Sequence, residues 1–248
     1  MKWCLEPGAS PLFGSDRGCA EFEQDVLRFD GPSEARTNAT DDEVLYVLAG
    51  SGVAELGGEP AELTRGTAAY VRRGIPWQVT EADGLEILSV LVREPLPGDT
   101  THAVIAVDEA EGLEILSVLV HDPLPGEETH AVVGVDDVET GTATAGRQFR
   151  LLAPCASVTQ FVGYIPVGRA PDHFHKYDEV VYVLEGDGAL HIDGETAPLR
   201  AGSCVHLPAR LVHCLENTGP GEMQVLGVFR PAGSPAEAYY PDGTKAVY

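Results

Sequence analysis

The chain has 248 residues, with 39 acidic against 16 basic side chains and a formal net charge of −23. A charge of this size and sign repels phosphate backbones and anionic lipid surfaces, so we expect neither nucleic acid nor membrane as a partner. The 28 glycines and 18 prolines indicate many turns between short strands, and an apolar share of 44% is enough for a packed core.

The N-terminal segment has no apolar run of signal-peptide length, and no stretch approaches the roughly 20 apolar residues that span a bilayer. The five cysteines include no CxxC pair, which argues against both a disulfide framework and a zinc ribbon. We therefore expect a cytoplasmic protein.

Short apolar or alternating runs follow one another along the chain, each closed by Gly, Pro or Asp, and helical periodicity is nearly absent. The clearest runs lie at 43–50, 66–73, 85–92, 179–186, 189–193, 203–208 and 223–231. This pattern predicts an all-β fold made of barrels or sandwiches.

Two internal repeats divide the chain. A shift of 136 residues places EVLYVLAGSG at 43–52 on EVVYVLEGDG at 179–188 without a gap, which indicates two homologous units. A second, closer repeat places 84–111 on 112–139, with twenty of 28 positions identical.

One copy of the closer repeat is expected to be an insertion. Each copy carries the apolar strand LEILSVLV, and only one of the two can complete the first unit. The other copy either adds a strand to a sheet edge or a subunit contact, because an exposed apolar strand needs a partner, or forms a surface linker.

The segment that carries chemistry is GRAPDHFHKYDEVVYVLEGDG, at 168–188. His173 and His175 are two residues apart, so both imidazoles face one side of an extended segment. Glu179 follows after a short bend, and His213 comes later with Asn217 four residues beyond it. Three imidazoles and a carboxylate form a mixed nitrogen and oxygen set that suits Mn, Fe, Co, Ni, Cu or Zn.

These segments resemble the two cupin motifs, G-x5-HxH-x3-E-x6-G and G-x5-PxG-x2-H-x3-N. In the first motif only the leading glycine, Gly168, is displaced from its expected position. The second motif lacks the glycine expected between Pro208 and His213. The resemblance implies an all-β bicupin of two tandem jelly-roll barrels. It also implies that His173, His175, Glu179 and His213 bind one divalent transition metal.

The expected division is an N-terminal barrel at 1–110, a linker with the near-duplicate at 111–146, and a metal-binding barrel at 147–248. The 136-residue shift puts Thr37, Ala39 and Trp77 where the second unit has its histidines, and only Glu43 matches Glu179. We therefore expect the metal in the C-terminal barrel only. Trp77 then either fills the old pocket or lines an apolar ligand site.

Four further side chains are candidates for substrate binding. Arg169 and Arg210 flank the motifs, and either can hold a carboxylate or phenolate, although both also fit solvated surface positions. Tyr164 is a candidate wall residue, and His206 is a candidate for supporting the ligands or for core packing.

The expected partner is a small-molecule substrate, and a homodimer is possible. The resemblance to quercetinase-like and oxalate-processing cupins favours a dioxygenase or other oxidoreductase, with Glu179 also accepting a proton. Two alternatives stay open: a non-redox isomerase, lyase or aminohydrolase, and a non-catalytic protein that binds a small ligand or metal.

Overall fold

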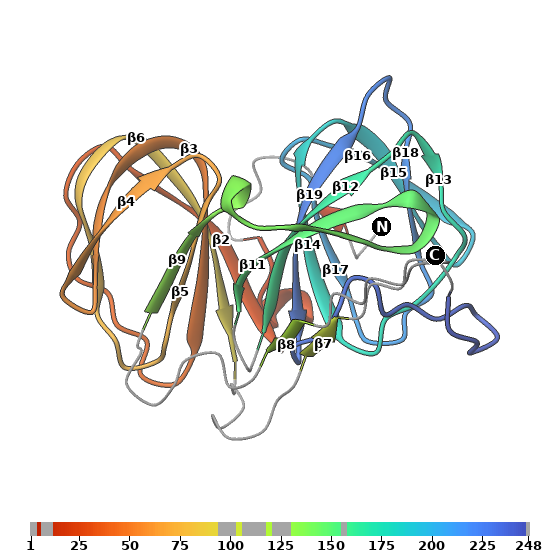
Figure 1. Ribbon diagram of the computed structural model, residues 1–248, viewed down its shortest axis with the longest axis horizontal. Coiled ribbons are helices and arrows are strands. Elements are labelled where there is room, and N and C mark those ends of the chain that lie inside the picture. Colours follow the sequence, from red (N-terminus) through yellow and green to blue (C-terminus); the bar gives the residue numbers. More distant parts are fainter. Residues whose placement is uncertain are drawn as a thin grey trace.

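Two β-barrels lie side by side in the computed structural model (Figure 1). The structure describes residues 4–5, 12–93, 103–105, 118–120, 130–154 and 158–246. Its helical segments in that part of the chain are three short 3-10 turns, at Ser15–Arg17, Val135–Asp137 and Thr144–Gly146. None of the described helices is long and apolar enough to cross a membrane. The all-β prediction is thus confirmed, as tandem jelly-roll barrels.

The first barrel is one six-stranded sheet in which two long strands bend round to form both walls. Asp42–Val47 of one long strand pairs with Ile87–Val92 of the other, and Ser51–Leu56 pairs with Trp77–Asp83 at the start of that second strand. The strands are β2 (Phe22–Phe29), β3 (Asp42–Leu56), β4 (Glu59–Thr64), β5 (Thr67–Val71), β6 (Trp77–Val92) and β9 (His130–Gly134).

The second barrel has a seven-stranded and a four-stranded sheet. The larger sheet runs β1 (Cys4–Leu5), β17 (Cys204–Leu207), β14 (Asp178–Glu185), β19 (Met223–Arg230), β12 (Thr159–Ile165), β11 (Gln148–Pro154) and β10 (Thr140–Thr142). The smaller sheet runs β13 (Gly168–Arg169), β18 (Cys214–Asn217), β15 (Asp187–Ile192) and β16 (Glu195–Arg200).

The first copy of the close repeat completes the first barrel. Its apolar run forms the second half of β6, which pairs with both β2 and β3. In the second copy, β8 (Val118–Val120) pairs with β7 (Ala103–Ile105) as a separate two-stranded sheet. The rest of LEILSVLV in that copy lies outside the described residues, so the prediction that it joins a barrel edge or a subunit contact stays untested.

The chain crosses between the barrels more often than the expected division at 110 and 146 allows. Cys4–Leu5 pairs with β17 of the second barrel, although it precedes the whole first barrel. His130–Gly134, within the expected linker, pairs with β5 of the first barrel. Both segments cover strand edges that would otherwise expose unpaired backbone groups.

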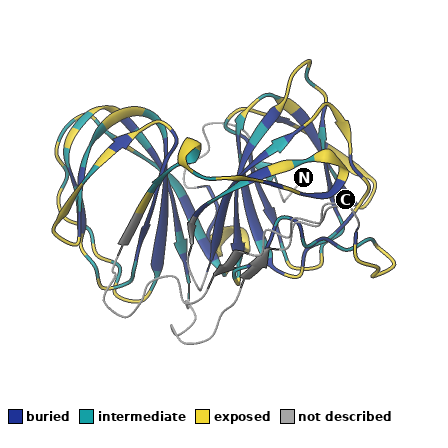
Figure 2. Ribbon diagram, in the orientation of Figure 1, coloured by how far each residue is buried: buried dark blue, intermediate teal, exposed yellow. Residues whose placement is uncertain are grey.

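The barrels meet through the outer faces of their sheets. On β3, Leu45 and Val47 point into the first barrel, whereas Val44 and Tyr46 join a core shared by both barrels. On β14, Val181 and Val183 point into the second barrel, and Val180 joins the shared core. Buried residues accordingly continue along the strands at the junction (Figure 2). Both faces of these strands are buried, which explains their nearly unbroken apolar sequence.

The interior of the first barrel is filled at the position that corresponds to the predicted metal site. Trp77, at the place of His213, is 1% exposed, and its indole N–H donates to the Glu43 carboxylate at 2.8 Å. Ser89 and Asn38 also donate to Glu43. Three donors thus satisfy the carboxylate of Glu43, the residue that matches Glu179 of the second unit. Of the two roles proposed for Trp77, the structural one is therefore favoured.

We expect Trp77→Phe to lower the free energy of unfolding by about 1–3 kcal/mol, because it leaves one buried Glu43 oxygen with a single donor. Urea denaturation followed by circular dichroism measures the change. Arg28→Gln is the control, because its exposed ion pair with Glu86 should contribute within about 0.5 kcal/mol. A Trp77→Phe protein no less stable than this control would contradict the assignment.

Candidate metal centre

Two extended segments bring three histidines together in the second barrel. His173 and His213 lie opposite each other in a β-bridge, with backbone N–H···O distances of 3.0 and 2.8 Å. His175 lies two residues further on, and its carbonyl accepts the backbone N–H of Arg210. The bridge fixes the two motifs against each other, and the two-residue spacing puts His175 on the same side as His173.

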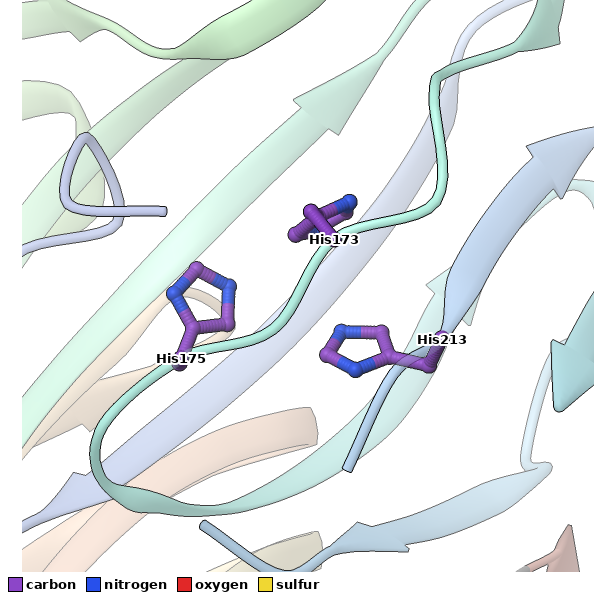
Figure 3. Close-up of side chains that lie close together, drawn as sticks. All are labelled: His173, His175 and His213. Carbon is purple, nitrogen blue, oxygen red and sulfur yellow. The ribbon is translucent and has the colours of Figure 1, made fainter. Parts of the chain in front are cut away.

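The three imidazoles form a compact buried group. Their candidate ligand atoms all lie within 4.8 Å of one another, and the residues are 4–8% exposed. Figure 3 shows the rings of His173, His175 and His213 around one space. Within the described part of the chain, this is the group that meets the geometric requirement for a metal site.

Hydrogen bonds to backbone carbonyls set the tautomer of all three rings. The Nδ1 atoms lie 2.9, 2.8 and 2.8 Å from the carbonyl oxygens of Pro171, Glu237 and Leu211, in the order His173, His175, His213. A carbonyl only accepts, so each Nδ1 carries the proton and each Nε2 keeps its lone pair. Such supporting bonds are usual for metal-ligating histidines.

The electrostatic setting keeps these imidazoles neutral. Burial lowers the pKa of His173 and His213 and brings that of His175 to about 3. The neighbouring imidazoles and the charge of Arg147 add to the effect at His175 and His213. Neutral imidazole is the form that binds metal, so the group is ready for a cation at ordinary pH.

Glu179 is the second residue of the strand that follows the HxH segment, and it lines the same cavity. It is 6% exposed, and burial raises the pKa of its carboxyl to about 8, against a smaller opposing effect of Arg147. The carboxylate oxygens of Glu179 lie outside the group of ligand atoms within 4.8 Å of one another that the three imidazoles form. A buried carboxyl in an apolar cavity beside three lone-pair nitrogens nevertheless fits a divalent transition metal, which would stabilise its charged form.

The cavity around these residues is small and largely apolar. Its volume is about 60 Å³, several times the roughly 10–15 Å³ that one water needs. Its apolar walls come from Ala143, Phe149, Phe161, Ile165, Ala170, Leu215, Val225, Phe229, Pro235 and Ala238.

Three of the four predicted substrate residues do not line this cavity. Arg169 is exposed on an edge strand and pairs with Asp172 at 2.8 Å. Arg210 is exposed in the turn after Pro208, with φ of 67°. These arginines are close to the motifs in sequence, but their backbone direction takes the side chains to the surface.

His206 is also elsewhere, because alternation along β17 turns it away from the barrel interior. Its neighbours Val205 and Leu207 pack inside the second barrel, whereas His206 lies 5.7 Å from the ring of Phe13 at the junction. Its Nε2 is 3.8 Å from Asp178. Tyr164 does line the cavity, as expected, with the Arg150 guanidinium 5.7 Å over its ring.

Arg147 lines the cavity and was missed by the sequence analysis. It lies between β10 and β11, and its guanidinium donates to the Leu215 carbonyl at 2.5 Å. The signal for it was weak: Arg147 and Phe149 alternate onto one face of an extended segment, but no motif spacing connects Arg147 to the histidines.

The C-terminal segment covers the centre and supports one of its rings. The Glu237 carbonyl accepts from His175, and Phe174 and Tyr239 exchange two backbone hydrogen bonds. The Tyr177 hydroxyl lies 3.2 Å from the Ser234 carbonyl and 3.0 Å from the Glu237 carboxylate. This segment is therefore part of the site as well as its cover.

Comparison with known families identifies the second barrel. Residues 160–229 match the family model described as "Cupin domain". The matched range holds His173, His175, Glu179 and His213.

Several curated proteins resemble the chain over part of their length. A "Polyketide synthase CurC" of Streptomyces cyaneus is 39% identical over 62 residues, which are 25% of this chain and 40% of that protein. An "Oxalate-binding protein" of Thermotoga maritima is 33% identical over 57 residues, 22% of this chain and 47% of the other. The matches span about a third to two thirds of these relatives.

Solved structures share the arrangement of both barrels at low identity. Protein Ylba from E. coli aligns with a TM-score of 0.68 and 13% identity, over 92% of this chain and 89% of its own. A mutant of Bacillus subtilis oxalate decarboxylase aligns with a TM-score of 0.63 and 16% identity, over 91% and 74%.

Fold and site together define a small-barrel protein whose imidazoles converge inside a jelly roll. Its second barrel matches the cupin domain family, and both barrels share the fold of the solved structures compared above.

The buried carboxyl of Glu179 should make the metal-free protein less stable as the pH rises. Its folded-state pKa of about 8 lies above the unfolded value of about 4.3. Its contribution to the free energy of unfolding is therefore fully present below the unfolded pKa and is lost as the pH rises through the folded-state pKa. Between pH 6.5 and 8, chelator-treated wild type should lose up to about 1.4 kcal/mol per pH unit relative to Glu179→Gln. Urea denaturation across this range measures the difference.

The control for this comparison is Glu185→Gln, an exposed glutamate on the same strand, which should follow the wild type. Parallel pH profiles for Glu179→Gln and wild type would show that Glu179 does not take up a proton on folding.

Tyr177→Phe should weaken metal binding by up to about tenfold, because it releases the segment that supports His175 while keeping the aromatic ring. Competition with a chelator measures the metal dissociation constant. Tyr240→Phe is the control. Tyr240 lies in the same segment, but its hydroxyl does not hold the segment by a hydrogen bond, so this variant should bind metal like the wild type. Equal affinities for both variants would contradict a supporting role of the C-terminal segment.

Proposed function

We propose that this cupin is a metal-dependent enzyme that acts on a small organic molecule, with His173, His175, His213 and Glu179 holding one divalent transition metal. The observation that carries this proposal is the set of three Nδ1 hydrogen bonds to carbonyls, which leaves three Nε2 lone pairs in one buried cavity. Three imidazoles and a carboxylate suit Mn, Fe, Co, Ni, Cu or Zn.

The reaction we propose is a dioxygenase or related oxidation. A redox-active metal with four protein ligands keeps one or two positions open for a substrate and dioxygen. Dioxygen is apolar, and the walls of the cavity are largely apolar as well, so they favour its entry. Glu179 would accept a proton released by the substrate when its bond to the metal loosens.

The resemblance to oxalate-related proteins supports metal use but not a particular substrate. A neighbouring structure is described as containing Mn(II) centres in Bacillus subtilis oxalate decarboxylase, and its identity to this chain is 14%. At that identity the likeness supports a shared fold, so the metal and the reaction have to come from this chain's own site.

A second candidate is a non-redox reaction, such as isomerisation, elimination or hydrolysis. The position of Glu179 favours it, because a carboxyl group that lines the cavity can both accept and donate a proton. In this case the metal would polarise a carbonyl group and need not change its oxidation state.

Elemental analysis of the purified protein tests the proposal first. We expect about one equivalent of metal per chain in the wild type, and loss of that metal in the His173→Ala, His175→Ala double variant, which removes two of three imidazoles. His191→Ala is the matched control, since His191 pairs with Glu216 outside the cavity and should not change metal content.

The identity of the metal directs the second measurement. Mn, Fe, Ni or Cu, together with oxygen uptake on addition of phenolic or dicarbonyl compounds, would support the oxidation. Turnover under nitrogen or with zinc would move the assignment to the non-redox reaction. Absence of metal from the wild type, even after loading, would overturn the proposal.

A further inference from the structure

Arg147 brings a fixed positive charge into the cavity that holds the three histidines. Its guanidinium donates to the Leu215 carbonyl, and a guanidinium has five N–H donors in all. Arg147 lines the cavity together with the three imidazoles and Glu179, and its charge acts on all four of these groups. Donors therefore remain that can face a bound molecule.

The charges around the cavity do not balance without an anion. Among the described residues that line it, Glu179 is the one carboxylate and Arg147 the one permanent cation. A divalent metal held by three neutral imidazoles and Glu179 keeps one net positive charge, and Arg147 adds another. Two unpaired positive charges in an apolar cavity are costly, and a single anion between them offsets much of that cost.

The cavity walls limit which chemical groups the rest of the anion can carry. Away from the histidines, Glu179 and Arg147, the described lining consists of Phe149, Phe161, Phe229, small and aliphatic side chains, and the neutral polar residues Thr144, Gln148 and Tyr164. None of these carries a positive charge, so a second carboxylate on the ligand, placed beyond Arg147, would find neutral donors at most. The space in the cavity, several times that which one water needs, suits a short ligand.

We propose that Arg147 is the specificity-determining residue of this site and anchors the carboxylate of a short monocarboxylate whose apolar part lies against Phe149 and Phe161. The inference rests on the proposed metal-dependent function and names its substrate class. A guanidinium suits this role because its planar fork matches both oxygens of a carboxylate. A longer dicarboxylate such as succinate is disfavoured, because its second carboxylate would lie beyond Arg147 without a cation.

Calorimetric titration of the full chain, reconstituted with zinc to avoid redox change, tests the anchor. Propionate should bind the wild type and lose about ten- to a hundredfold in affinity in Arg147→Gln, because a charged hydrogen-bond partner is removed. Arg147→Lys should fall between, since it keeps the charge and loses the fork. Arg150→Gln is the matched control: Arg150 follows three residues later, pairs with Asp136 and does not line the cavity.

Two other probes check the substrate class. 1-Propanol has the same apolar chain without the charge and should bind far more weakly than propionate. Succinate, which is propionate with a second carboxylate, should also bind more weakly than propionate. Succinate affinity equal to or above that of propionate would overturn the monocarboxylate assignment.

Metal content and thermal unfolding, measured on each variant, separate this inference from the proposed function. Unchanged metal content with equal propionate affinity in wild type, Arg147→Gln and Arg147→Lys would overturn the anchor and leave the metal centre standing. If the wild type binds no metal but still binds propionate through Arg147, the metal proposal fails and the anion site stands. Should Arg147→Gln not fold, Arg147→Lys carries the comparison.

Discussion

The structure depends on one constraint: the sheets that join the two barrels are buried on both faces. Val44 and Val180 occupy equivalent places in the shared core, and Leu45 and Val181 occupy equivalent places inside their own barrels. Strands of this kind cannot slip by one residue, because every side chain would move to the opposite core. The register that results fixes where β14 begins, and with it the position of Glu179 at the cavity.

Within this common framework the two barrel interiors have diverged in chemistry. At the positions of Glu43 and Trp77, the first barrel satisfies its buried carboxylate with donors from its own chain. At Glu179 and His213, the second barrel has a carboxyl and an imidazole at the wall of a cavity. The same backbone thus supports a packed core in one unit and a polar site in the other, and the difference lies in a few side chains.

The sequence was sufficient for the parts of this description that leave a local pattern. Strands closed by Gly and Pro, the 136-residue repeat and the HxHxxxE spacing predicted the barrels and the histidine group. Other parts depend on contacts between distant residues. Cys4 pairs with Val205, and Arg147 lies beside the histidines, but no motif spacing in the sequence connects these residues. Arg169 and Arg210 show the converse error, since being near a motif in sequence does not direct a side chain into its cavity. His206 could have been placed correctly, because Val205 and Leu207 beside it already marked the opposite face as the interior.

The strand Cys4–Leu5 has a consequence for how the protein is made. These residues precede the first barrel in the chain, yet their partners on β17 are made only after the first barrel and most of the second have been synthesised. The outward faces of β3 and β6 must likewise wait for the second barrel before they are covered. The first barrel therefore emerges with an open apolar face, and the two halves mature as one unit rather than in succession.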